Sequence, residues 1–181
     1  TKNVLNSWSA SSRLGTGMHK CFEQFLNGEP VAKANEYAAE MDQFHAAMAE
    51  LSHLTPARTE MSIYANDAQG DPAVAGQIDL LMKDAEGGLH IVDFKRTPGD
   101  LAPEACCYGK RFLNDLPLND HHKYSLQLQL YAIMLELQTG HRVKSMRLMQ
   151  VHPDLDAARL IETTDMREHA VDLLRSVGVE V

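Results

Sequence analysis

The stretch "GGLHIVDFKRTPGD", residues 87–100, determines how the rest of the chain is interpreted. Gly-Gly and Pro-Gly bound a run that is typical of a buried strand, with apolar residues Leu89, Ile91 and Phe94. Asp93 and Lys95 interrupt the end of this run. Because side chains two residues apart point to the same face of a strand, this carboxylate and this ammonium group project together. A charged pair therefore lies on a strand that is otherwise suited to burial.

The composition indicates one globular domain. The chain has 181 residues, of which 44% are hydrophobic and 23% charged. It contains no apolar run of the roughly 20 residues that a membrane-spanning helix needs, and its first residues lack the apolar segment of a secretory signal. We therefore expect an intracellular protein, cytoplasmic or nuclear, with no membrane partner. Since the first residue is Thr, the domain could be excised from a larger protein.

Cysteine content and charge exclude some classes of protein. Three cysteines, Cys21, Cys106 and Cys107, are too few for a disulfide framework or for the four thiolates that usually hold an iron–sulfur cluster. The formal net charge of −8 is unfavourable for binding nucleic acid, whose phosphates attract Lys and Arg. It does not exclude this partner, because clustered carboxylates can hold divalent cations that reverse the local sign.

The periodicity of the chain predicts a mixed central sheet with flanking helices. Three strands joined by short turns, most simply an antiparallel meander, are predicted over residues 59–67, 73–84 and 88–97. Helices are predicted over residues 16–26, 30–54, 122–140 and 165–177, and further strands over residues 142–153 and 159–164. Gly28 and Gly140 are predicted to end two of these helices. Residues 98–121 are expected to form a long surface excursion.

A second carboxylate lies one strand before Asp93. The segment "GQIDLL" places Asp79 between two apolar residues, where an unpaired charge is costly. In a hairpin, Asp79 would lie within one or two residue pairs of Asp93. Two such carboxylates repel each other and raise each other's pKa unless a cation lies between them. A Mg²⁺ or Mn²⁺ ion would satisfy this arrangement, and Lys95 could then act on a bound phosphate or on the attacking water.

The ordered motifs of the chain resemble the PD-(D/E)XK nuclease superfamily, in particular its RecB-type branch without an iron–sulfur cluster. The Asp of one strand and the D/E-x-K element of the next match Asp79 and Asp93-x-Lys95. The segment "GTGMHKCFE" is similar to the first helix of that branch, where a His joins the metal ligands. "QLQLY" is similar to its Gln-x-x-x-Tyr element, and "RTEMSIY" supplies an acid on the preceding strand. These three segments contribute His19, Gln127 with Tyr131, and Glu60.

The resemblance implies a restriction-endonuclease-like α/β fold over residues 1–181 and a nuclease that hydrolyses phosphodiester bonds, as an endonuclease or an exonuclease. It implies Mg²⁺ or Mn²⁺ as cofactor and nucleic acid as partner, DNA being favoured over RNA. The implied catalytic residues are Asp79, Asp93 and Lys95. The implied metal ligands are His19, Asp79, Asp93 and the backbone carbonyl of Phe94. The implied substrate contacts are Gln127, Tyr131 and Glu60.

Each of these residues could instead have a purely structural role. Asp93 and Lys95 could form an ion pair at a strand end, and a histidine such as His19 more often serves helix packing. Tyr131 could be a core residue, and Glu60 a surface charge or a group that orients a ligand. For the whole protein, the alternative is a non-catalytic nucleic-acid-binding module on a nuclease fold. The complete set of candidate ligands argues against that alternative.

Overall fold

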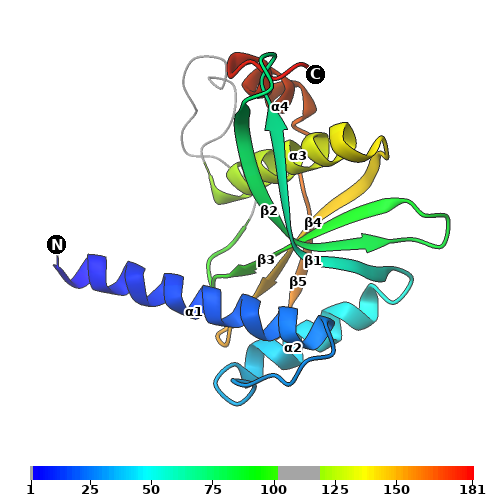
Figure 1. Cartoon of the computed structure of the whole chain (residues 1–181). Helices are drawn as coiled ribbons and strands as arrows, with labels where there is room; N and C mark the ends of the chain where they lie inside the picture. Colours follow the sequence, from blue (N-terminus) through cyan, green and yellow to red (C-terminus); the bar gives the residue numbers. More distant parts are fainter. Residues whose placement is uncertain (1, 102–118) are drawn as a thin grey trace.

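A computed structural model describes the backbone of residues 2–101 and 119–181, and side chains from residue 12 onward. Within these residues, one sheet of five strands has helices on both faces (Figure 1). The strands are β1 (Thr55–Asn66), β2 (Pro72–Lys83), β3 (Leu89–Arg96), β4 (Val143–Val151) and β5 (Arg159–Glu162). The helices are α1 (Lys2–Leu26), α2 (Ala38–Glu50), α3 (Asp120–Thr139) and α4 (Arg167–Ser176). This is the predicted α/β architecture.

The sheet is mixed. Strands β1, β2 and β3 form the predicted antiparallel meander, and β5 pairs antiparallel with β4. Strands β3 and β4 run parallel, which requires the chain to cross over the sheet, and α3 lies on that crossover. Most of the predicted surface excursion, together with Cys106 and Cys107, lies outside the described residues. No helix in the described part of the chain is long and apolar enough to cross a membrane.

Two hydrophobic cores lie on the two faces of the sheet. Helices α1 and α2 cover one face and contribute Met18, Phe22 and Phe44 to its core. Helices α3 and α4 cover the other face and contribute Leu128 and Leu174. Both cores contain strand residues that are fully buried, so the sheet is protected from solvent on both sides. Charged residues inside this sheet therefore require a specific explanation.

Helix ends agree with the prediction better than helix starts. Gly28 and Gly140 have φ of 70° and follow the ends of α1 and α3, as predicted. The predicted start of the first helix at residue 16 is wrong, because α1 begins at Lys2 and its first turns project beyond the body of the domain (Figure 1). The prediction followed apolar spacing, and a helix that leaves the core no longer needs that spacing.

The predicted second helix over residues 30–54 is also too long. Residues 32–37 form turns, and α2 is confined to Ala38–Glu50. Tyr37 is buried just before the helix, and its ring fills the space beside Gly17, where an added Cβ would lie 2.0 Å from the Tyr37 hydroxyl oxygen. This tertiary contact overrides the helical propensity of the Ala-rich segment.

Candidate metal centre

Three carboxylates from neighbouring strands lie in one row across the sheet. The β1–β2 register places Glu60 opposite Asp79. The β2–β3 register reaches the Leu80–Val92 pair, and one further residue places Asp79 opposite Asp93. Opposed residues in antiparallel strands project to the same face. We call Glu60, Asp79 and Asp93 the carboxylate row.

The regular alternation of side chains breaks at this row. Ile78 packs in the core beneath α3, whereas Leu80 packs in the core beneath α1, although residues two apart normally share a face. Opposite the break, Glu60 has a φ of 47°, a left-handed conformation that is uncommon for residues other than Gly. Backbone strain of this kind costs energy and tends to occur at functional sites. Here the irregularity places Asp79 between the two cores instead of inside one of them.

His19 reaches the carboxylate row from α1. Its Nε2 donates a hydrogen bond to the carbonyl oxygen of Phe94 at 2.9 Å. Its Nδ1 lies 3.5 Å from Asp79 Oδ1 and 4.0 Å from Glu60 Oε1. Burial opposes the charged imidazolium, but the hydrogen bond and charge of Asp79 raise the pKa of His19 above its ordinary value. Candidate ligand atoms of His19, Glu60 and Asp79 lie within 4.8 Å of one another, which is close enough to hold one ion.

Asp93 is the most buried member of the row and is not in that three-residue cluster. It is 3% exposed, and its Oδ2 lies 2.6 Å from Lys95 Nζ. Lys95 is the partner of this oxygen among the described residues, and the two form a buried ion pair. Burial and the charge of Asp79 raise the pKa of Asp93 to about 6. Partial burial and Asp79 likewise raise the pKa of Glu60. The three carboxylates of the row therefore carry more negative charge than the nearby His19 and Lys95 neutralise.

The backbone of Phe94 on β3 bonds to both Asp79 on β2 and His19 on α1. Its N–H donates to Asp79 Oδ2 at 2.8 Å, while its carbonyl accepts from His19. Its ring is buried and meets Phe22 and Phe44 edge-on. The predicted ligand atom, the Phe94 carbonyl oxygen, is thus beside His19 and is fixed by a core side chain.

Helix α3 supplies Gln127 and Tyr131, but they contact each other and not Lys95. Gln127 Nε2 donates to Tyr131 Oη at 2.8 Å, and neither side chain bonds to Lys95 among the described residues. Instead, Lys95 Nζ lies 4.4 Å from the ring centre of Tyr124 on the same helix. Tyr124 is not part of any of the motifs that predict the site. Its spacing of three and seven residues from Gln127 and Tyr131, which places all three on one helix face, was the available signal.

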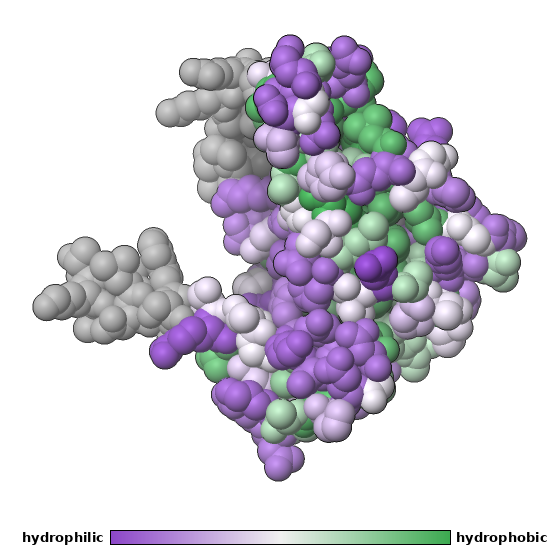
Figure 2. All heavy atoms as spheres, in the orientation of Figure 1, coloured by the Kyte–Doolittle hydropathy of each residue, from purple (hydrophilic) through white to green (hydrophobic). Residues whose placement is uncertain are grey.

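A cleft of about 600 Å³ opens onto the site. One wall is the face of α1 between Ser12 and Glu23, and His19 lies on it. The opposite wall includes Glu60, Lys95 and Tyr124. Figure 2 shows a mainly hydrophilic face over α1 and α2, with more of the hydrophobic side chains over α3 and α4. Of the candidate metal ligands, His19, Glu60 and Phe94 line this cleft.

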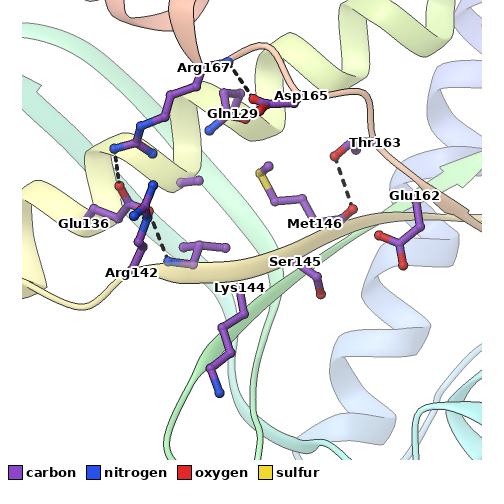
Figure 3. Close-up of a pocket in the computed structure, with 12 residues that line it drawn as sticks. Gln129, Glu136, Arg142, Lys144, Ser145, Met146, Glu162, Thr163, Asp165 and Arg167 are labelled. Carbon is purple, nitrogen blue, oxygen red and sulfur yellow. Dashed lines mark hydrogen bonds and ion pairs between the residues drawn. The ribbon is translucent and has the colours of Figure 1, made fainter.

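A second hollow, of about 260 Å³, lies between α3, β4 and the start of α4 (Figure 3). Its charged groups are largely paired. Arg167 contacts Glu136 at 2.7 Å, and Lys144 contacts Asp84 at 2.6 Å. Glu136 also accepts a hydrogen bond from the backbone N–H of Val143 at 3.1 Å. The contacts of Glu136 join α4 and β4 to α3, and the Lys144–Asp84 pair joins β4 to the turn after β2, so we regard this hollow as structural.

Comparisons with known proteins identify the family and the fold of the chain. A family model described as the PD-(D/E)XK nuclease superfamily matches residues 31–177. A crystal structure of a candidate exonuclease from Eubacterium rectale is similar with a TM-score of 0.52 and 12% identity. The match covers 90% of this chain but only 64% of that one, so this chain spans less than two thirds of its length. This likeness confirms the restriction-endonuclease-like α/β fold.

A crystal structure of the protein SSO0001 is similar with a TM-score of 0.40 and 16% identity, over 90% of this chain and 72% of that one. The comparison with curated proteins gives no match. His19 lies outside the residues that the family model matches. A metal role for His19 therefore rests on its position beside the carboxylate row.

Proposed function

The chain belongs to the PD-(D/E)XK nuclease superfamily, and on this premise we propose that it is a divalent-metal-dependent nuclease acting on nucleic acid, DNA in preference to RNA. The observation that carries the proposal is the carboxylate row with His19 on one side and Lys95 on the other. We assign the chain to the RecB-type branch because His19 comes from the first helix and Gln127 and Tyr131 from α3. Two further statements remain predictions: that the domain spans residues 1–181, and that the protein is intracellular.

The residues of the row fit a divalent cation. Carboxylate and carbonyl oxygens are the ligands that Mg²⁺ prefers, and an imidazole nitrogen suits Mn²⁺ better. Asp93 is 3% exposed, and burial together with the charge of Asp79 raises the pKa values of both Asp93 and Glu60. We propose His19, Asp79, Asp93 and the Phe94 carbonyl as ligands, with Glu60 close enough to join them. The hydrogen bond between His19 Nε2 and the Phe94 carbonyl must open for both groups to bind the same ion. Because His19 Nε2 bonds to Phe94, its Nδ1 is the atom that faces the acids.

When bound, Mg²⁺ or Mn²⁺ neutralises charge on the phosphate and lowers the pKa of water. Lys95 supplies a second positive charge at the same place. Burial opposes this charge, but Asp93 raises the pKa of Lys95 above its ordinary value, so the side chain is an ammonium group at neutral pH. We therefore assign Lys95 to hold an oxygen of the scissile phosphate and to orient the attacking water, not to remove its proton.

We assign the remaining candidate residues, Glu60, Gln127 and Tyr131, to contact the substrate or the groups that bind it. Glu60 lines the cleft and lies where it can orient water or join the ligands. Gln127 is fixed to Tyr131 on α3, the helix whose Tyr124 lines the cleft, and we assign both residues to contact the substrate.

The proposal is tested by incubating the protein with end-labelled linear DNA, circular DNA and RNA of the same sequence, with Mn²⁺, Mg²⁺ or EDTA. Cleavage of circles would identify an endonuclease, and loss of the end label alone an exonuclease. Asp93→Asn is the matched inactive control. Metal-independent binding without cleavage would favour the non-catalytic module, and no cleavage of any substrate with either metal would overturn the proposal.

A further inference from the structure

Two groups hold the ammonium of Lys95 among the residues that the structure describes. Asp93 Oδ2 lies 2.6 Å from Nζ, and the face of the Tyr124 ring lies 4.4 Å from Nζ to ring centre. The Lys95 side chain is 18% exposed, so both contacts are largely shielded from water. An ammonium group over an aromatic face is attracted by the ring quadrupole, and this attraction strengthens when the groups are desolvated.

The two attractions respond differently to a cation at the carboxylate row. A divalent ion on Asp93 would compete with Lys95 for the same carboxylate and would repel its ammonium group. The Tyr124 ring carries no net charge and is not a ligand candidate, so its hold on Lys95 would persist. The Tyr124 ring would therefore fix the position of the Lys95 ammonium group once Asp93 binds a metal ion.

The position of Tyr124 is itself fixed. Tyr131, seven residues later on α3, packs against the backbone of Gly76 on β2. Gln127 lies between them on the same helix face and bonds to Tyr131. These contacts set the rotation of α3 against the sheet, and this rotation presents Tyr124 to Lys95 at the wall of the cleft.

We propose that Tyr124 is a positioning residue whose ring face holds the Lys95 ammonium group at the reacting phosphate. The proposal rests on the nuclease function proposed above. It requires the aromatic face of residue 124 and not its hydroxyl, because Nζ lies over the ring. An alternative is that the ring stacks on a nucleobase of the substrate, which would alter substrate binding and not turnover.

Kinetics of Tyr124→Phe and Tyr124→Leu separate these possibilities. We expect Tyr124→Phe to keep kcat within about twofold and Tyr124→Leu to lower kcat by about 3- to 30-fold with KM unchanged. Tyr64→Leu, which removes an exposed tyrosine ring away from the cleft, is the matched control and should leave both constants unchanged. A Tyr124→Leu effect on KM alone would assign the ring to the substrate and overturn the proposal. Equal losses in the Phe and Leu variants would overturn it as well.

A second readout needs no activity. In NMR spectra of the metal-free protein, the Lys95 ε-methylene protons should be shifted upfield by the ring current of Tyr124, with the resonance assigned by its loss in Lys95→Arg. The shift should persist in Tyr124→Phe and vanish in Tyr124→Leu. If wild type cleaves nothing, the proposed function fails, whereas an unshifted Lys95 resonance in folded wild type refutes the contact independently.

Discussion

The ring of Tyr131 occupies the space that any side chain at position 76 would need. A Cβ added to Gly76 would lie 2.3 Å from Tyr131 Cε1, far closer than two carbon atoms can approach. Gly76 precedes Asp79 by three residues on β2, and Tyr131 bonds to Gln127 on α3. The Gly-x-x-Asp and Gln-x-x-x-Tyr segments are therefore joined by one contact between a strand and a helix.

Gly76→Ala should destabilise the protein by about 1–3 kcal/mol, because the Tyr131 ring must move to accommodate the methyl group. Tyr131→Ala should also destabilise it, by loss of packing. The double variant should be less destabilised than the sum of the single variants, since the smaller residue at position 131 removes the clash. Urea denaturation of the four proteins measures this coupling. Additive losses, within about 0.5 kcal/mol, would show that the two residues do not compete for space.

Asp93→Asn and Lys95→Met should both lower cleavage strongly, but for different reasons. Asp93→Asn removes a charged ligand, so Mn²⁺ affinity should fall by about 10- to 100-fold. Lys95→Met removes only the ammonium group, so Mn²⁺ affinity should be unchanged or higher, while turnover falls by about 100- to 1,000-fold. Calorimetry and gel assays on the same preparations distinguish the two. Near wild-type turnover in Lys95→Met would refute the role assigned to Lys95.

Stability of the metal-free protein should fall as pH rises from 4 to 7. The pKa of Asp93 is raised from 3.8 to about 6 in the folded state, by burial first and then by Asp79. Its contribution to stability is therefore complete below about pH 4 and is lost as pH rises through 6, on the order of 1–3 kcal/mol. His19, whose pKa is also raised, adds a loss in the same direction above pH 6.5.

The comparison is made against Asp93→Asn in EDTA, because burial lowers the pKa values of His121 and His122 and gives them the opposite pH dependence. The wild type should show the steeper decline in free energy of unfolding between pH 4 and 7. Mn²⁺ should then raise the melting temperature more at pH 7.5 than at pH 5.5, since ligands must be deprotonated to bind metal. Parallel pH profiles for the two proteins would show that Asp93 is not the titrating group.

His19→Ala should weaken Mn²⁺ binding more than Mg²⁺ binding. An imidazole nitrogen is a softer donor than a carboxylate oxygen, and it contributes more to the binding of Mn²⁺ than of Mg²⁺. His53→Ala, which alters an exposed histidine after α2, is the matched control. Isothermal titration with each metal measures the difference. If both metals lose affinity equally, or neither does, His19 serves packing and the acids alone form the site.

The strand order and the approach of two acids could be predicted from sequence, because they follow from local rules. The short turns between β1, β2 and β3 require hairpins, and hairpin spacing brings Asp79 opposite Asp93. The ends of α1 and α3 follow from Gly28 and Gly140. The start of α2 could not be predicted in this way, because the turns before it are fixed by the contact of Tyr37 with Gly17 on another helix.

Within the site, the residues that sequence patterns missed or misplaced depend on tertiary contacts. Tyr124 has the pattern of an ordinary core aromatic residue, and only the approach of Lys95 from β3 distinguishes it. Sequence patterns allow Glu60 to be a substrate contact, a group that orients a ligand or a surface charge, whereas its left-handed backbone and its position opposite Asp79 place it in the carboxylate row. The ion pair of Asp93 with Lys95, in place of a shared cluster with His19, depends on side-chain conformations that strand periodicity does not determine.

The carboxylate row makes electrostatic repulsion part of the folding barrier. The β1–β2 and β2–β3 hairpins close short loops, whereas pairing β3 with β4 requires closure of the whole segment from 97 to 142, so the hairpins are expected to form first. Glu60, Asp79 and Asp93 then meet in the transition state, before α1 delivers His19. In stopped-flow experiments with EDTA, Asp79→Asn should refold faster than wild type, by roughly fivefold for each 1 kcal/mol of relieved repulsion. It should also unfold faster, because the variant loses the attraction between Asp79 and His19 that forms after the barrier. A change confined to the unfolding rate would mean that the acids converge only after the barrier has been crossed.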